Sequence, residues 1–150
     1  MYDAVEIGYN YRMTEIQAAL GLSQLNRLEL FIERRNEIAQ RYREALADLP
    51  VILPPAAQSG FVHGYHLFAI RVPRRAEVFR YMRRHRIGVQ VHYIPVHHHT
   101  VSADVLLPKG GLPVCEEVYS GLISLPVFPE LTEEDQDTVV RVLTAALDEK

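Results

Sequence analysis

Residues 8 to 14 bring several groups that suit an anion into one short turn, directly before a helical segment. Asn10 offers a side-chain amide and Arg12 a planar guanidinium, while Thr14 is a good helix N-cap. The free N–H groups of a helix start and the positive end of its dipole would add to them, so the turn suits a phosphate. The alternative is an ordinary capped helix start whose Arg12 pairs with a carboxylate. Local chemistry alone favours this plainer interpretation.

A second polar stretch holds four histidines within eight residues, at positions 92 and 97–99. Such density suggests zinc, but no carboxylate stands within the run and the nearest acid along the chain is Asp104. The sequence therefore predicts no metal site, although adventitious nickel or zinc is compatible with it. The better functional interpretation is a polar loop at the mouth of a binding site, with His92 and Tyr93 at a strand end. The alternative is an ordinary surface loop.

The rest of the chain offers little catalytic chemistry. It contains no glycine-rich phosphate loop of the Walker or Rossmann type. Cys115 stands beside Glu116 and Glu117, whose charges oppose thiolate formation. The only lysines are Lys109 and Lys150. Local patterns alone thus give a possible anion site within an incomplete active site.

The composition is that of a globular domain. The chain has 150 residues, 48% of them hydrophobic and 23% charged, which is enough for one domain with a core. The net charge of −3 argues against a nucleic-acid or anionic-membrane surface. A single cysteine permits a reducing cytosol, and neither a signal peptide nor a membrane span of about 20 apolar residues is recognisable. We therefore expect a cytoplasmic protein.

The anion-binding turn must be positioned by a long helical pattern that runs from Thr14 to Leu49 without a proline. A continuous helix of this length would extend roughly 50 Å, against about 30 Å for the diameter of such a domain. We therefore expect either a bend near residues 25–29 or a helix that projects toward something outside this chain. Residues 18–22 are small and apolar on nearly all sides, so we expect them to be buried on several sides or pressed against another backbone. A dimer seam or coiled coil would also explain the apolar stripe.

The histidine stretch must be held by a small mixed domain. Alternating or apolar patterns predict strands at 66–72, 89–93 and 123–125, and helical patterns predict helices at 76–86, at 113–121 and after Thr132. Thr132, with Asp135 three residues on, resembles a capping box. The order favours an α+β domain in which helices cover one side of a three-stranded sheet.

Several separated motifs resemble the DegT-type (StrS-type) sugar aminotransferases, which use pyridoxal 5′-phosphate to aminate keto-sugars carried on nucleotides. In chain order they are residues 8–19, 24–25, 35, 42, 66–68, 88–97, 115–116 and 124–129. The resemblance is strongest to members that aminate C4 of a UDP-linked 4-keto-6-deoxy sugar on the pseudaminic acid pathway. It implies the C-terminal small domain of a fold-type-I aminotransferase, with about three short strands, helices and a long N-terminal helix.

The resemblance also implies where the domain boundaries of the chain lie and which catalytic groups it lacks. Residues 1–13 would be the tail of the large domain, 14–49 a connecting helix and 50–150 the small domain. The cofactor-binding lysine of the family lies in a large domain that this chain does not resemble, and neither Lys109 nor Lys150 lies in the family's lysine motif. We therefore assign no catalytic residue, and expect the chain alone to be inactive and not to retain the cofactor.

Site residues follow from matching motif positions. Asn10 matches the position that reaches across a dimer to the cofactor phosphate, and Arg12 is a second candidate there. His92, Tyr93 and His97 match the loop that lines the nucleotide-sugar pocket, although residues 98–100 depart from the usual pattern. The resemblance thus implies a homodimer, a nucleotide-sugar substrate and an amino-acid donor, with glutamate expected. The alternative is a non-catalytic dimerisation or helper module derived from the same fold.

Overall fold

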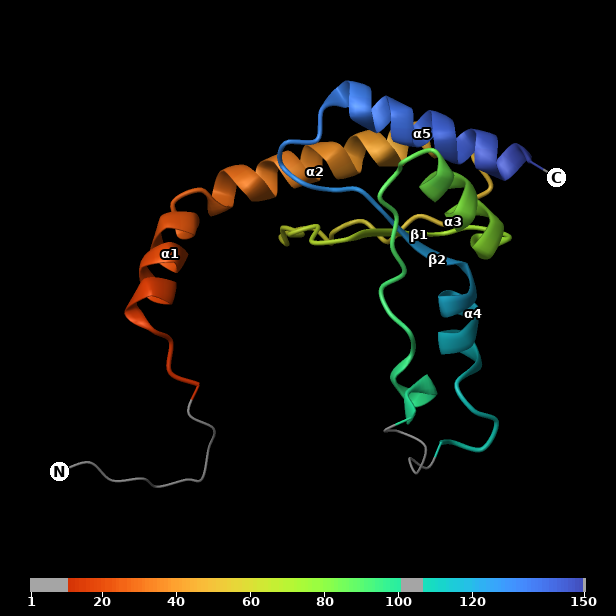
Figure 1. The fold of residues 1–150 in the computed structure, drawn as a ribbon, viewed down its shortest axis with the longest axis horizontal. Coiled ribbons are helices and arrows are strands. Elements are labelled where there is room, and N and C mark those ends of the chain that lie inside the picture. The colour runs from red at the N-terminus through yellow and green to blue at the C-terminus, as the bar shows by residue number, and fades with distance from the viewer. Residues whose placement is uncertain (1–10, 101–106, 150) are drawn as a thin grey trace.

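A computed structural model describes residues 11–100 and 107–149, and within these ranges the chain forms five α-helices, one short 3₁₀ helix and two strands. Figure 1 shows two long helices lying across the top of a small sheet, with two arms that extend from the same side of the molecule. The elements are, in order, α1 (Glu15–Leu25), α2 (Leu28–Ala45), β1 (Phe68–Arg71), α3 (Arg75–Arg84), η1 (Val96–His98), α4 (Pro113–Gly121), β2 (Leu122–Leu125) and α5 (Glu133–Asp148).

The sheet is an antiparallel pair in which Phe68 of β1 faces Leu125 of β2 and Ile70 faces Ile123. The strand predicted at residues 89–93 is wrong in extent. It is reduced to one bridge, in which Gln90 exchanges backbone hydrogen bonds with Ser124 at 2.8 and 3.3 Å. The described sheet therefore has two strands instead of three, because the chain continues away from β2 after this single bridge.

The core lies between this sheet and the helices α2, α3 and α5. Tyr42 from α2, Phe68 from β1 and Leu143 from α5 are all completely buried, and Val78 and Met82 bury the inner face of α3. The predicted helix at 76–86 and the final helix after Thr132 are thus present, with boundaries shifted by one or two residues. Because the apolar face of each helix is covered by the sheet or by a neighbouring helix, these elements form one packed unit.

Arg35 interrupts the apolar stripe of the long helical segment, and its contacts explain why. Its guanidinium donates to the carbonyl oxygen of Tyr65 at 3.0 Å and to that of Val127 at 3.3 Å. A charged donor on two backbone acceptors satisfies groups that the loops would otherwise leave unpaired. The arginine therefore fastens α2 to the segments before β1 and after β2.

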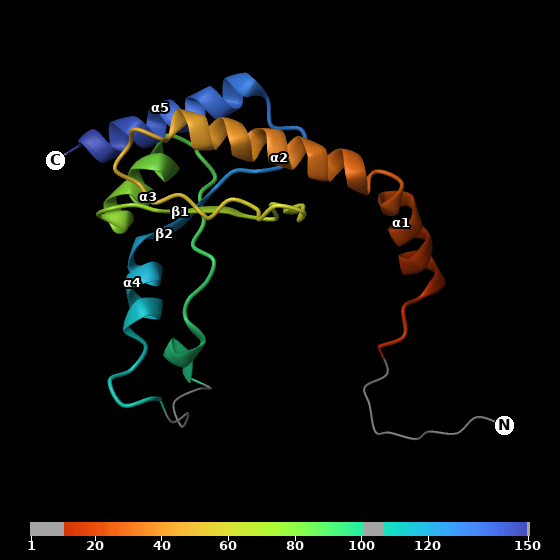
Figure 2. The same ribbon diagram turned by 180° about the vertical axis from the view of Figure 1, so that it is seen from behind.

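Of the two alternatives for the long helical segment, the structure has the bend near residues 25–29. α1 ends at Leu25 and α2 begins at Leu28, with Arg27 donating its N–H to the carbonyl of Gln24 at 3.0 Å in the turn between them. The expectation that residues 18–22 are buried is wrong for the described chain, because α1 contains no buried residue. Beyond the bend, α1 extends away from the sheet (Figures 1 and 2), so no described core element covers it.

Among the described residues, no helix is long and apolar enough to span a membrane.

Two helices begin at the threonines that the sequence predicts as N-caps. Thr14 and Gln17 form a complete capping box at α1, and the Thr132 hydroxyl accepts from the Asp135 N–H at the start of α5. The Asp135 carboxylate accepts from the hydroxyl of Thr132. Both predicted N-caps are therefore confirmed.

Candidate functional site: two projecting arms

Those assigned residues that the structure describes lie on two separate arms. We call the first the α1 arm (residues 11–25) and the second the histidine arm, which consists of residues 91–99 and α4. Figure 1 shows both arms extending from the same side of the α2–α5 layer, well apart from each other. The chain therefore does not bring its predicted phosphate contacts and its predicted sugar contacts together by itself.

The α1 arm begins with a well-defined helix start. The hydroxyl of Thr14 accepts from the N–H of Gln17 at 3.3 Å, and the Gln17 side chain accepts from the N–H of Thr14 at 2.9 Å. The first N–H that reaches a carbonyl of the helix is that of Ala18, which donates to Thr14 at 2.9 Å. The N–H groups of Glu15 and Ile16 precede it, so the helix itself gives them no partner. Arg12 lies exposed just before this turn. Asn10 lies outside the described residues.

These groups fit one part of pyridoxal phosphate and not the rest. An exposed arginine two residues before a helix N-cap, together with the first-turn N–H groups, offers suitable donors to a phosphate. The carbonyl end of the cofactor needs an amine, and Lys109 is the single lysine among the described residues, in an exposed loop beside the histidine arm rather than on the α1 arm. The described α1 arm thus supplies phosphate contacts and no group for covalent attachment.

His92 is fixed to the sheet at the base of the histidine arm. Its Nδ1 lies 2.9 Å from Oγ of Ser124, a buried residue of β2. The neighbouring ring of Tyr93 stands edge-on to His92, with the ring centroids 4.8 Å apart, and is 69% exposed. A rigid imidazole beside an accessible aromatic ring is a suitable wall for a sugar or a base.

His97 is held farther along the arm by an acid that the sequence patterns did not single out. Its Nε2 lies 2.5 Å from Oε1 of Glu116, and Nε2 of His98 lies 2.8 Å from the same oxygen. These hydrogen bonds, first that of His97 and then that of His98, hold the pKa of the Glu116 carboxyl below its ordinary value. The side chain of His97 is only 12% exposed.

Sequence reasoning misses the role of Glu116 because this acid stands 18 residues beyond His98, next to Cys115 rather than within the histidine run. The predicted helix at 113–121 could have indicated this contact, because the helix must lead back to the sheet in order to reach β2. A helix that runs beside the histidine stretch places its first turn near the histidines. The acid that the run itself lacks is thus supplied by α4.

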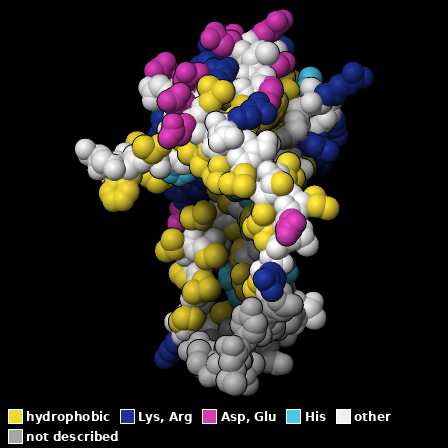
Figure 3. All heavy atoms as spheres, turned by 90° about the vertical axis from the view of Figure 1, so that its left-hand side faces the viewer, with side chains coloured by type: hydrophobic (Ala, Val, Ile, Leu, Met, Phe, Trp, Pro, Cys, Tyr) yellow, Lys and Arg dark blue, Asp and Glu magenta, His cyan; other side chains and the backbone are white. Residues whose placement is uncertain are grey.

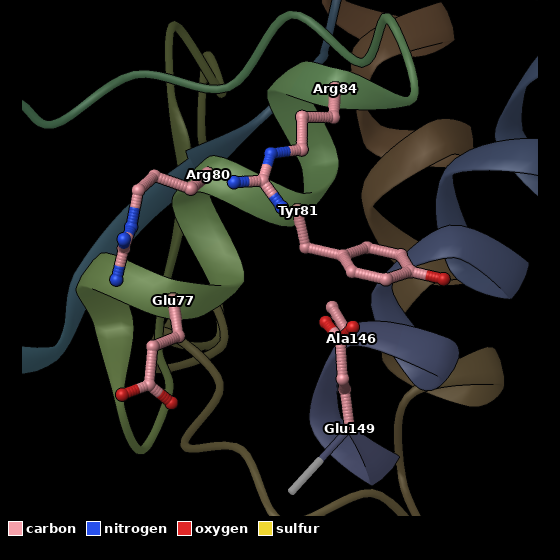
Figure 4. Close-up of a pocket in the computed structure, with 6 residues that line it drawn as sticks. All are labelled: Glu77, Arg80, Tyr81, Arg84, Ala146 and Glu149. Atoms are coloured by element: carbon pink, nitrogen blue, oxygen red, sulfur yellow. The ribbon is translucent and has the colours of Figure 1, made fainter.

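A surface hollow lies between α3 and α5 (Figure 4), and no residue of either arm lines it. It has a volume of about 220 Å³, and its lining includes Glu77, Arg80, Tyr81 and Arg84. Its walls carry both signs of charge and none of the assigned residues. The residues on the arms, and not this hollow, therefore form the candidate site.

The α1 arm also exposes much apolar surface. Ile16 is 84% exposed, and the exposed fractions of Leu20, Leu22 and Leu25 all exceed 60%. Figure 3 shows hydrophobic side chains gathered on the face of the molecule that carries this arm, while charged side chains concentrate over the α2–α5 layer. Apolar side chains in such number on one short helix are typical of a surface that another chain or domain covers.

Comparison with known proteins gives a consistent result. The profile of the DegT/DnrJ/EryC1/StrS aminotransferase family matches residues 1–144. A dTDP-3-amino-3,4,6-trideoxy-alpha-D-glucose transaminase of Micromonospora megalomicea subsp. nigra is 33% identical over 141 residues, which are 91% of this chain and 38% of that protein. The chain spans about 40% of the length of the curated relatives it matches.

Solved structures agree with the sequence matches. A putative sugar aminotransferase of Streptococcus pneumoniae, determined in its PLP form, matches 99% of this chain and 39% of its own, with 25% identity and a TM-score of 0.88. Helicobacter pylori PseC, an aminotransferase involved in the biosynthesis of pseudoaminic acid, matches 97% of this chain and 40% of its own, with 26% identity and a TM-score of 0.83. The expected fold is thereby confirmed.

Proposed function

Because the chain belongs to the DegT/DnrJ/EryC1/StrS aminotransferase family, we propose that its 150 residues are part of a pyridoxal-phosphate-dependent nucleotide-sugar aminotransferase. The complete enzyme would transfer an amino group from an amino acid, with glutamate as the expected donor, to a nucleotide-linked 4-keto-6-deoxy sugar. The observation that carries this proposal is the agreement of nearly the whole chain with a sugar aminotransferase in its PLP form. The match to PseC supports the choice of sugar.

The α1 arm would contact the cofactor phosphate. When bound, pyridoxal phosphate supplies the electron-accepting ring on which amino transfer depends. The contribution of this chain would be electrostatic, since Arg12 and the first-turn N–H groups of α1 offer donors to a phosphate. Asn10 would add an amide donor and reach the site of a second copy.

The histidine arm would contact the nucleotide sugar. His92 would hold a defined orientation because its ring is hydrogen-bonded to Ser124. Tyr93 offers an exposed ring for a sugar or a base, and His97 offers an imidazole held by Glu116. These side chains would position the substrate rather than perform covalent chemistry.

We further propose that the chain acts with a lysine-bearing large domain and as a dimer. The separation of the two arms supports this, because a complete site would need groups from elsewhere (Figure 1). The exposed apolar side chains of α1 offer a surface for such contacts. Residues 1–13, 14–49 and 50–150 would then be the large-domain tail, the connecting helix and the small domain. The chain alone would be inactive and would not retain the cofactor, and we place the enzyme in the cytoplasm.

A chimera tests the proposed roles. The corresponding C-terminal part of the Streptococcus pneumoniae aminotransferase is replaced by this chain, and retention of pyridoxal phosphate is followed by its visible absorbance during dialysis. Asn10→Ala is expected to weaken retention, whereas Asn26→Ala, the same change at the other end of α1, is expected to leave it unchanged. Equal retention in both variants would contradict the phosphate role.

The same chimera separates the substrate arm from the cofactor arm. His97→Ala is expected to raise KM for the nucleotide sugar with little change in cofactor retention, and His85→Ala, on the surface of α3, is the control. A rise in KM that is identical in the two variants would contradict the assignment of His97. A chimera that forms a stable dimer without binding the cofactor would favour the dimerisation module instead.

A further inference from the structure

The histidine arm contains a cluster that substrate contacts do not explain. His97, His98 and Glu116 each present one ligand atom, and these three atoms lie within 4.8 Å of one another. Two imidazole nitrogens approach a single carboxylate oxygen, at 2.5 and 2.8 Å. One of the two rings, that of His98, belongs to residues 98–100, which depart from the motif that the sequence resembles.

The spacing is close to that of a bound metal ion. Nitrogen and carboxylate ligands lie about 2.0–2.2 Å from zinc, so two ligand atoms of a tetrahedral site are separated by about 3.3 Å. The carboxylate oxygen would have to retreat from both nitrogens by less than about 1 Å. The two nitrogens, which lie within 4.8 Å of each other, would have to approach by at most about 1.5 Å. The Glu116 side chain is 45% exposed and the His98 side chain 38%, so both have room for this adjustment. The ion would then take the place of the protons that now join the three groups.

The backbone around the cluster is held in place on both sides. The two histidines lie in η1, where the N–H of His98 donates to the carbonyl of Pro95 at 2.9 Å. α4 is fixed to the sheet at its far end, because Val72 donates its N–H to the Gly121 carbonyl at 2.9 Å, and a Cβ at Gly121 would lie only 3.1 Å from the Val72 carbonyl. Arg71 of β1 also pairs with Glu117 of α4 at 3.2 Å. Glu116 is thus presented to the histidines by a positioned helix.

We propose that His97, His98 and Glu116 bind a divalent metal ion, for which Zn²⁺ is the best match. Two imidazoles and one carboxylate are a ligand set that zinc uses with a fourth position left to water or another ligand. Nickel, cobalt and copper also accept imidazole ligands, whereas Mg²⁺ prefers oxygen donors throughout. The ionised Glu116 supplies the negative charge that two neutral imidazoles lack. This proposal concerns metal binding alone and does not depend on the proposed aminotransferase function.

Metal binding is measured on the full 150-residue chain, purified without a histidine tag and treated with a chelator. ZnCl₂ is titrated by calorimetry in the presence of a weak competing chelator, and bound metal is counted after dialysis. We expect about one Zn²⁺ per chain and no saturable binding of MgCl₂. Addition of CoCl₂ is expected to give the visible absorbance of cobalt in a site of low coordination number.

Two ligand variants and two controls make the test specific. His98→Ala and Glu116→Gln are expected to lose stoichiometric Zn²⁺ binding while keeping the circular dichroism of the parent, because both side chains are on the surface. His99→Ala and His85→Ala are expected to keep it. Loss of binding in His99→Ala, unchanged binding in Glu116→Gln, or the absence of saturable binding by the parent chain would each overturn the proposal.

Discussion

Tyr42 gives a sharp test of the packing between α2 and the sheet. Its side chain is completely buried, its ring lies 5.2 Å from that of Phe68, and its hydroxyl donates to the carbonyl of Pro126 at 3.0 Å. Burial raises the pKa of the Tyr42 phenol well above its ordinary value of 10.0. The folded chain therefore keeps this phenol protonated at a pH at which the unfolded chain ionises it.

The sign of the effect follows from proton linkage. A group with a raised pKa in the folded state contributes its stability fully below the unfolded pKa, and the contribution is lost as the pH rises above that value. Above pH 10 the free energy of unfolding should therefore fall by about 1.4 kcal/mol per pH unit because of Tyr42 alone. At pH 11 the loss relative to pH 8 is about 1.4 kcal/mol.

The assay is urea unfolding, followed by circular dichroism, at several values between pH 8 and pH 11. Tyr42→Phe is expected to cost about 1 kcal/mol at pH 8, because it removes one hydrogen bond and leaves the Pro126 carbonyl without this donor. The variant should also lose the alkaline slope that Tyr42 causes. Tyr93→Phe is the control, since its exposed hydroxyl meets water in both states. An alkaline slope in Tyr42→Phe equal to that of the parent would refute the reasoning.

Substitutions at three further positions test other parts of the account. Thr132→Ala removes the N-cap of α5 and should therefore lower the free energy of unfolding, measured by urea unfolding, by about 1 kcal/mol. Arg35→Met should cost about 2 kcal/mol in the same assay, since two loop carbonyls lose a charged donor, and Arg35→Lys should recover part of it; no cost in Arg35→Met would contradict that role. Leu20→Glu should leave the circular dichroism of the folded chain unchanged and lower the mass measured by light scattering, because this exposed side chain is proposed to lie in an interface. An unchanged mass would count against α1 as that interface.

Local signals in the sequence were sufficient for the helices. Thr14 and Thr132 are threonines at helix starts, and both cap as their positions predict. The comparison of helix length with domain size left two alternatives, a bend near residues 25–29 or a projecting helix, and the structure has the bend. These features depend on neighbouring residues or on chain dimensions, so a single sequence contains the information.

Local sequence patterns could not predict features that depend on residues far away in the chain or on another chain. The alternation at residues 89–93 predicted a strand, but whether a strand pairs along its length depends on the course of its neighbour, and only Gln90 pairs. The apolar residues 18–22 predicted burial, yet nothing in the described chain covers α1. The apolar pattern of residues 18–22 indicates that this face of α1 is an interface, but it does not identify the chain or domain that packs against it.

In the candidate site, too, some residues could be assigned from the sequence and others required the tertiary structure. His92, Tyr93 and His97 were assigned through resemblance to family motifs, and the structure places all three on one arm. The convergence of Glu116 on two histidines required the tertiary path of α4, which no local pattern encodes. Asn10 lies outside the described residues, so its role stays a prediction.

The most direct test of the central claim is amination of a nucleotide-linked 4-keto-6-deoxy sugar by the chimera that joins this chain to a lysine-bearing large domain. Product formation from glutamate and the keto-sugar is followed by mass spectrometry, beside the 150-residue chain alone with added pyridoxal phosphate. The account predicts cofactor-dependent turnover by the chimera and none by the chain alone. A folded, cofactor-bound chimera that aminates no keto-sugar, or turnover by the chain alone with a borohydride-trapped adduct on one of its lysines, would contradict it.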